Sequence, residues 1–144
     1  MYRLIAVIAV MSIFAGLCGV SSADEGGFFE AMQMKINNIP VSMEWEDNES
    51  AKALSENLPI TVKMHMYGGF EQVGELGRSL PRNDKRITTK PGDIVLYSGN
   101  QIVVFYGSNT WAYTRLGRIT GKTQSELSDL LGKSDAVITI SAAP

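Results

Sequence analysis

The side chains that could carry chemistry are few and lie far apart in the chain. His65 is the only histidine and Cys18 the only cysteine. A metal site needs several convergent ligands, and no second histidine can join His65. As a general base His65 would need a nearby nucleophile motif, and none adjoins it. We therefore expect His65 to be a solvated residue on the outer face of a strand. The sequence identifies no catalytic residue and no metal site.

The charged residues form two groups. Glu44, Glu46, Asp47 and Glu49 could bind Ca²⁺, but they lack the glycine and the distal glutamate of an EF-hand loop. The first two share one strand face and the last two lie near a helix start, where negative charge is favourable. We expect these four acids to be solvated structural residues.

Residues 77–90 form the longest segment without a clear pattern, and a segment of this length is often functional or mobile. Its basic side chains are Arg78, Arg82, Lys85, Arg86 and Lys90, against the single acid Asp84. This basic loop could steer an anionic partner toward the domain. A solvated loop without a partner is the simpler interpretation.

Four aromatic residues, Phe70, Phe105, Trp111 and Tyr113, could line an apolar groove for a peptide or a small molecule. Some of them must belong to the core, because alternation does not distinguish the inside of a closed sheet from its outside. Both interpretations remain open at this stage.

Short strands and turns must position these side chains. Residues 32–36 alternate between apolar and polar types, as a half-buried strand does, and Asn37-Asn38 is typical of a hairpin turn. The further predicted strands cover residues 39–46, 60–67, 70–76, 91–97, 101–107, 116–119 and 136–140, with a Ser-Gly-Asn turn at 98–100. In the strand at 60–67 we expect Ile60, Val62, Met64 and Met66 to point inward.

Two short helices complete the pattern. Residues 47–50 offer capping groups for a helix that Pro59 ends. Thr123 and Glu126 form a capping box before a second helix, which stops at Gly132. About seven or eight short strands with two helices predict a mainly β domain, a closed or nearly closed barrel.

The first 23 residues read as a secretory signal peptide. Arg3 is followed by an apolar run at 4–20 and by Ser21-Ser22-Ala23, a small-residue cleavage site. We expect cleavage after Ala23 and export to the periplasm or the extracellular space. An uncleaved anchor is the alternative, but the run falls short of the roughly 20 residues that span a bilayer. A lipoprotein at Cys18 would need a smaller residue than Leu17 before it.

The mature chain would then begin with a flexible segment at 24–31, followed by one domain at 32–144. It would contain no cysteine, hence no disulfide and no thiolate site. The whole chain has a formal net charge of −2, which argues against nucleic acid as a partner. We expect no cofactor, and no membrane contact after cleavage.

The order of these elements resembles the cyclophilin fold. The likeness rests on the strand and helix at 41–46 and 50–54, Pro-Gly-Asp-Ile at 91–94 and Leu-Gly-Arg-Ile at 116–119. A small bacterial group of cyclophilin-like domains is more similar still. It shares Leu-Pro-Ile-Thr at 58–61, Glu71 with Leu76 and Leu80, Gly92-Asp93 and Phe105-Tyr106. The resemblance covers about residues 34–131 and implies a cyclophilin-like β-barrel.

True cyclophilins are peptidyl-prolyl isomerases, whose strand motif carries an arginine near the twisting amide. This chain has Met66 at the matching position, and no histidine follows Trp111. Because the aromatic residues are retained while the isomerase arginine and histidine are missing, our leading hypothesis is an exported, non-catalytic or weakly catalytic module that binds a peptide or a small molecule in a groove. The candidate groove residues are Phe70, Glu71, Phe105, Trp111, Tyr113 and Arg118.

Two alternatives stay open. The domain could be a cell-envelope isomerase in which Arg118 or Arg78 replaces the missing arginine, which rests on fold analogy. It could also be an accessory domain that docks to another envelope protein through the basic loop.

Overall fold

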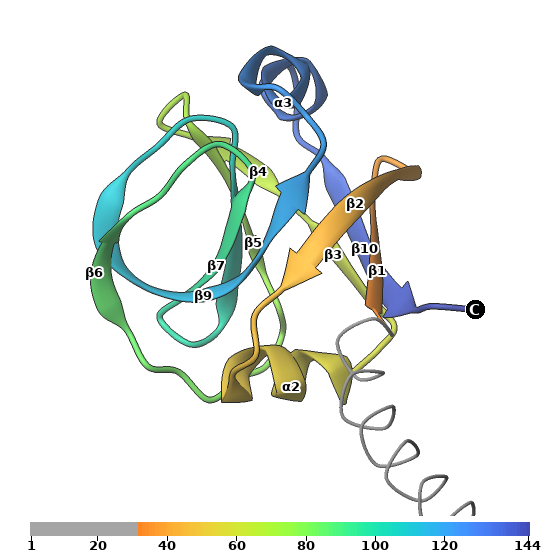
Figure 1. The fold of residues 1–144 in the computed structure, drawn as a ribbon, viewed down its shortest axis with the longest axis vertical. Helices are drawn as coiled ribbons and strands as arrows, with labels where there is room; N and C mark the ends of the chain where they lie inside the picture. The colour runs from red at the N-terminus through yellow and green to blue at the C-terminus, as the bar shows by residue number, and fades with distance from the viewer. Residues whose placement is uncertain (1–31) are drawn as a thin grey trace, which may run out of the picture.

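The structure, a computed structural model, describes residues 32–144. The predicted signal peptide at 1–23 and the segment 24–31 lie outside the described residues. The elements are β1 (Met32–Ile36), β2 (Ile39–Trp45), α2 (Glu49–Ser55), β3 (Ile60–Lys63), β4 (His65–Tyr67), β5 (Glu71–Glu75), β6 (Lys85–Thr88), β7 (Asp93–Tyr97), β8 (Gln101–Phe105), β9 (Thr110–Thr120), α3 (Gln124–Leu131) and β10 (Val137–Ala142). Figure 1 shows their arrangement.

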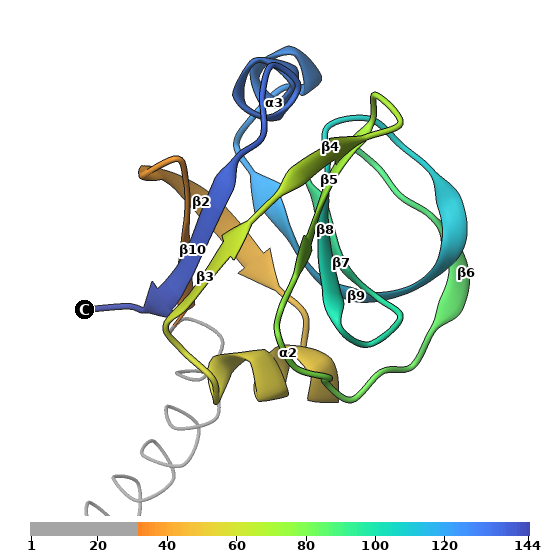
Figure 2. The ribbon, with the colours of Figure 1, turned by 180° about the vertical axis from the view of Figure 1, so that it is seen from behind.

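The strands form one antiparallel sheet in the order β3-β10-β1-β2-β9-β7-β8-β5-β4, with β6 paired to β9. The first and last strands of this order, β3 and β4, are consecutive along the chain and are separated only by Met64. The sheet therefore returns on itself as a nearly closed barrel, which Figures 1 and 2 show from opposite sides. The predicted mainly β class, with two short helices, is confirmed.

Alternating apolar residues fill the barrel. The side chains of Ile36, Ile94 and Leu116 are fully buried in one large cluster. Leu54 of α2 and Leu131 of α3 belong to the same cluster. The two helices lie at opposite ends of the barrel (Figure 2) and close it with these leucines.

Local signals in the sequence located the turns and helix starts correctly. Asn37 and Asn38 adopt φ values of 50° and 65° between β1 and β2, a left-handed conformation that asparagine tolerates. The Asn48 side chain accepts a hydrogen bond of 2.8 Å from the amide of Ala51 at the start of α2. Thr123 and Glu126 form the predicted capping box of α3.

The strand predictions needed three corrections. The described residues contain ten strands against the eight predicted, because β6 lies inside the predicted loop at 77–90 and the predicted strand at 60–67 is two strands, β3 and β4. The predicted short strand at 116–119 is the end of an 11-residue strand, β9. Met66 was expected inward but is 37% exposed. Its amide bonds to Asp135 Oδ1 instead of a strand carbonyl, because pairing with β10 has ended by this point and the residue lies beyond the core.

A bulge in β9 directs the first part of this strand away from the barrel. Ile94 pairs with Gly117 while Val95 pairs with Arg115, so β9 carries one extra residue and bends there. Residues 110–113 of β9 leave the barrel and pair with β6. We call β6 together with residues 110–113 the arm. Figure 1 shows the arm as an arch beside β5 and β7.

Candidate functional site

A cavity of about 890 Å³ lies between the arm and the outer face of the barrel. We call it the arm cavity. Its walls come from the segment of β3 and β4, from β5, from the ends of β7 and β8, and from residues 109–113. Its volume is within the range of about 300–1,000 Å³ that is usual for small-molecule sites.

Strand β5 places side chains on both sides of the sheet. Gln72 points into the barrel, where its amide nitrogen donates to the carbonyls of Leu131 (2.6 Å) and Ser134 (2.9 Å) and its oxygen accepts from the amide of Ala136 (2.8 Å). Because side chains alternate along a strand, Glu71 and Val73 point outward, and both line the arm cavity. The fixed Gln72 therefore sets the orientation of its neighbour Glu71.

Glu71 has the most unusual environment in the cavity. Glu71 as a whole residue is only 5% exposed to solvent. Among residues 32–144, no donor forms a hydrogen bond or an ion pair with its carboxylate within ordinary distances. Burial disfavours the charged form and raises the pKa of Glu71 from 4.5 to about 7. This carboxyl group can therefore gain or lose a proton near neutral pH.

Tyr113 forms the inner wall of the cavity on the side of the arm. It is 4% exposed, and its ring lies edge-on to Tyr97 and Phe105, with centroids 6.1 Å and 5.7 Å away. Its hydroxyl oxygen accepts a hydrogen bond of 2.9 Å from Asn109 Nδ2. Burial raises the pKa of Tyr113, so the hydroxyl stays neutral. Trp111 lies at the rim and is 51% exposed.

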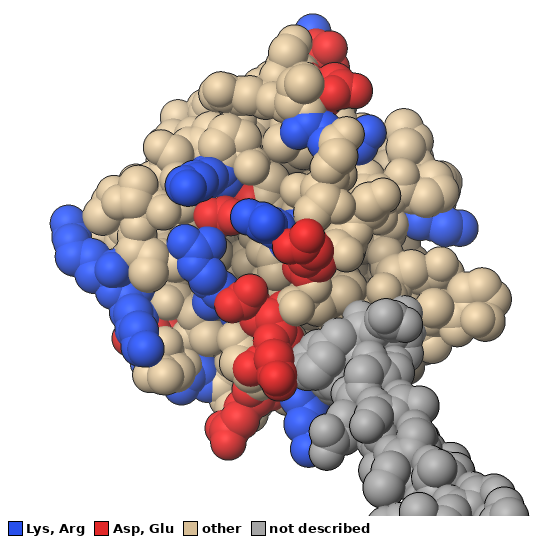
Figure 3. Space-filling model, in the orientation of Figure 1, with Lys and Arg blue, Asp and Glu red and all other residues tan. Residues whose placement is uncertain are grey.

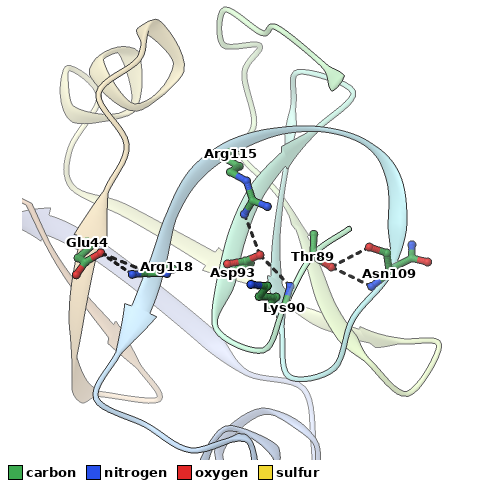
Figure 4. Close-up of polar contacts among 7 residues, drawn as sticks. All are labelled: Glu44, Thr89, Lys90, Asp93, Asn109, Arg115 and Arg118. Atoms are coloured by element: carbon green, nitrogen blue, oxygen red, sulfur yellow. Dashed lines mark hydrogen bonds and ion pairs between the residues drawn. The ribbon is translucent and has the colours of Figure 1, made fainter. Parts of the chain in front are cut away.

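Buried polar contacts hold both ends of the arm, as Figure 4 shows. At one end, Thr89 Oγ1 accepts from the amide of Asn109 (2.9 Å) and donates to its carbonyl (3.0 Å). Asp93 Oδ2 accepts from the amide of Lys90 (2.9 Å), which follows Thr89, and from Nη1 of Arg115 (2.9 Å), which lies just beyond the other end of residues 110–113. These contacts fix the position of Tyr113 and Trp111 against the barrel.

Comparison with known families identifies the domain. The family model described as the Cyclophilin-like family matches residues 34–141. The chain belongs to the cyclophilin-like family. The predicted resemblance and the cyclophilin-like fold are thereby confirmed.

A solved structure agrees with this assignment. The solution structure of a hypothetical protein from Archaeoglobus fulgidus is similar to this domain with a TM-score of 0.56 and 18% sequence identity. The match covers 78% of this chain and 93% of that one. This likeness shows the fold alone. No curated protein matches the chain.

In this cyclophilin-like domain, three of the six predicted groove residues line the arm cavity: Glu71, Trp111 and Tyr113. Phe105 is fully buried and supports Tyr113, and Phe70 packs against the same small cluster, edge-on to Tyr67 at 6.4 Å. Arg118 does not reach the cavity. It is exposed and pairs with Glu44 Oε2 at 3.1 Å on another part of the barrel (Figure 4).

Sequence reasoning missed other residues of the cavity. Tyr97 lies in an apolar strand whose two faces the sequence did not distinguish, and Asn109 carried no signal at all. His65 and Met66 stand at the cavity rim on β4. His65 is exposed, as expected, and its Nδ1 lies 3.5 Å from Asp135 Oδ2. The hydrogen bond from the amide of Met66 is the main cause that lowers the pKa of Asp135.

A second cavity of about 480 Å³ lies near the start of α2, and we call it the loop cavity. Arg82, Lys85 and Arg115 line it, together with Asn83, whose amide donates to Thr114 Oγ1 at 2.9 Å. Two of the cations have acidic partners: Arg82 pairs with Asp84, and Arg115 with Asp93. Figure 3 shows Lys and Arg side chains gathered over β6 and Asp and Glu side chains over the end of β2 and α2.

Two further findings concern the part of the chain that the structure describes. It contains no group of three His, Cys, Asp or Glu side chains placed to hold a metal ion. None of its helices is long and apolar enough to cross a membrane.

Proposed function

We propose that this domain binds a peptide or a small molecule in the arm cavity and acts as a binding module. One observation supports this proposal above the others. The cavity is already formed, has aromatic walls, and contains the buried carboxyl group of Glu71, which has no partner among the described residues. Perturbed titratable groups in an apolar pocket are a common mark of binding and active sites.

Filling the cavity tests the proposal. Val73 is half-buried and points into the arm cavity from β5, so Val73→Phe should occupy the space of a ligand. We expect a pool of short peptides and metabolites to raise the melting temperature of the wild-type protein and to leave that of Val73→Phe unchanged. Lys35→Phe, at an exposed position of β1, is the matched control and should respond as the wild type does.

Two results would contradict the proposal. One is a wild-type protein that no component of the pool stabilises. The other is a Val73→Phe variant that keeps the full ligand-induced shift. The melting temperature without ligand checks that each variant is folded.

Isomerase activity is the alternative, and it rests on analogy with the cyclophilin fold. It needs a cation beside the twisting amide. Within residues 32–144 no arginine lines the arm cavity, and Met66, at the position of the isomerase arginine, stands at its rim. Arg118 pairs with Glu44, and Arg78 donates to Asn57 Oδ1. We expect no acceleration above the uncatalysed rate in a protease-coupled assay on a proline tetrapeptide. A clear acceleration would favour the isomerase.

We also propose that the domain works outside the cytoplasm, after removal of residues 1–23. The support is the order of charge, apolar run and small residues at the start of the chain. Terminal sequencing of the protein recovered from a secreting bacterial host should find Asp24 first. A chain that still begins at Met1 would contradict the cleavage, and recovery from the cytoplasm alone would contradict the export.

A further inference from the structure

We infer that the ligand of the arm cavity carries a positively charged amine or ammonium group, which pairs with the carboxylate of Glu71 among the rings of Tyr97, Trp111 and Tyr113. This inference rests on the proposed function and names the chemical class of ligand. It follows from three features of the cavity within residues 32–144: a largely buried carboxyl group without a partner, cations that do not pair with it, and aromatic walls.

The Glu71 carboxyl group forms no hydrogen bond or ion pair in the described part of the fold, and its oxygens keep access to the cavity, since no fully buried side-chain oxygen there lacks a partner. Buried polar groups nearly always have hydrogen-bond partners, because removing them from water is unfavourable. The neighbouring Gln72 follows this rule, with three hydrogen bonds inside the barrel. Glu71 is 5% exposed and has none through its carboxylate among residues 32–144. Its side chain points into the cavity, where a ligand can supply the missing donor.

The cations among the described residues form no ion pair with Glu71. Lys63 and His65 are the basic residues that line the arm cavity. His65 lies beside Asp135, with 3.5 Å between Nδ1 and Oδ2, and Lys63 forms no ion pair within the described residues. Neither pairs with Glu71. An uncharged apolar ligand would leave this carboxyl group buried without a partner, and an anionic ligand would add repulsion.

Aromatic rings complete a cation site. The faces of tryptophan and tyrosine rings attract cations through their electron-rich π systems. Tyr97 and Tyr113 are in edge-to-face contact, and Asn109 holds the hydroxyl of Tyr113 in place. Glu71 is near enough to Tyr113 to contribute to the raised pKa of that hydroxyl. The rings and the carboxylate therefore border the same part of the cavity.

The test compares three probes of equal chain length: hexylamine, hexanol and hexanoate, which are cationic, neutral and anionic at about pH 8. Trp111 reports binding by fluorescence in the Trp45→Phe background, which removes the other tryptophan. We expect hexylamine to bind about tenfold more tightly than hexanol, since a charge-assisted hydrogen bond contributes roughly 1.5–3 kcal/mol. Hexanoate should bind most weakly. The preference for hexylamine should shrink at about pH 5, where Glu71 is protonated.

Variants assign the preference to one residue. Glu71→Gln keeps the size of the side chain and should bind hexylamine and hexanol equally, while hexanol affinity stays within about twofold of wild type. Glu75→Gln, on the same face of β5 but exposed, should keep the wild-type preference. If Glu71→Gln fails to fold, the pH dependence is measured in the His65→Gln background, which removes the histidine that also lines the cavity, and a preference that shrinks there still assigns it to Glu71.

The outcomes separate this inference from the proposed function. If hexanol binds in the cavity and hexylamine binds no more tightly at about pH 8, the inference is wrong and the binding module stands. A preference that survives in Glu71→Gln also overturns it. If none of the probes binds and the ligand pool has no effect, the proposed function fails and the inference fails with it.

Discussion

A carboxyl group that is partly desolvated by folding makes the stability of a domain depend on pH. The pKa of Glu71 is about 7 in the folded chain and 4.5 as the ordinary value. Between these values the folded chain keeps a proton that the unfolded chain has lost. The contribution of Glu71 to the free energy of unfolding therefore falls as the pH rises through this window. Above the window this contribution no longer changes with pH. Glu71 thus destabilises the fold at neutral pH.

The first prediction concerns Glu71→Gln, which removes this titration. The wild-type free energy of unfolding should fall by no more than about 3 kcal/mol between about pH 5 and about pH 8 on account of Glu71, since one pKa unit equals about 1.36 kcal/mol and water in the open cavity lessens the effect. Urea denaturation at both pH values measures the difference between wild type and variant. The free energy of unfolding of Glu75→Gln should fall with rising pH as that of the wild type does. Equal pH dependence in Glu71→Gln and wild type would exclude Glu71 as the cause.

At the scale of elements, the arm is the part of the domain that depends most on a few polar contacts. Its base is held by Thr89, which is 1% exposed and makes two side-chain hydrogen bonds with the backbone of Asn109. Strand β6 pairs with β9 alone, whereas the strands inside the barrel order pair with a neighbour on each side. We therefore expect the arm to open in local fluctuations that leave the barrel intact.

The second prediction uses Thr89→Val, which removes the hydroxyl group and keeps the shape. The arm should lose about 1–2 kcal/mol of local stability, because the amide of Asn109 is left without its acceptor. Hydrogen exchange should quicken at amides of residues 85–88 and 110–113 and stay unchanged in β1 and β10. Thr88→Val is the matched control: its hydroxyl bonds only to Thr110 on the exposed side of the arm. Uniform acceleration across the whole domain would contradict local opening.

The arm also marks the limit of what the sequence could predict. The caps at Asn48 and Thr123 were found because their partners lie three residues away. Strand β6 was missed because Lys85–Thr88 contains one apolar residue and pairs with a strand more than twenty residues later. Strands β7 and β8 are buried on both faces, by the barrel core on one side and the small cluster under the arm on the other. Their continuous apolar pattern therefore hid which residues face the cavity.

The candidate site shows the same limit. Trp111 and Tyr113 were identified by residue type, and Glu71 only through the family resemblance. Arg118 was predicted to lie in the groove, but it pairs with Glu44 on the neighbouring strand. The register between these two strands cannot be read from a local sequence pattern. Residue type alone could identify the aromatic wall, but the position of a charge around a barrel depends on strand pairing between distant parts of the chain.

At the scale of the whole molecule, barrel closure decides where β5 lies and hence whether Glu71 faces the cavity. The closing segment crosses β5 at Gly74. A Cβ atom there would lie 2.4 Å from Val62 Cγ1, 2.5 Å from Met64 Sδ and 3.0 Å from the carbonyl oxygen of Lys63. These distances leave no room for a side chain, so closure in this form requires glycine at this position.

The third prediction is that Gly74→Ala destabilises the domain by about 1–3 kcal/mol through this overpacking. Val62→Ala removes the nearest methyl groups and should cost about 1–3 kcal/mol alone, since it leaves a small cavity. The double variant should be destabilised by at least about 1 kcal/mol less than the sum of the two single variants. The smaller side chain at position 62 relieves the crowding at position 74, and the added methyl group at position 74 fills part of the void at position 62. Urea denaturation of the four proteins measures this coupling.

A control distinguishes crowding from a general effect of replacing glycine in a strand. Ile36→Val on β1 lies in the same barrel core but is not among the atoms that would meet a Cβ at Gly74. Its effect should add to that of Gly74→Ala within about 0.5 kcal/mol. If Val62→Ala were equally additive, the close contact between β3 and β5 would not limit closure. If the predicted coupling is found, this contact and Gln72 together hold the barrel face of β5, and the orientation of Glu71 toward the arm cavity is a property of the closed barrel and not of the arm.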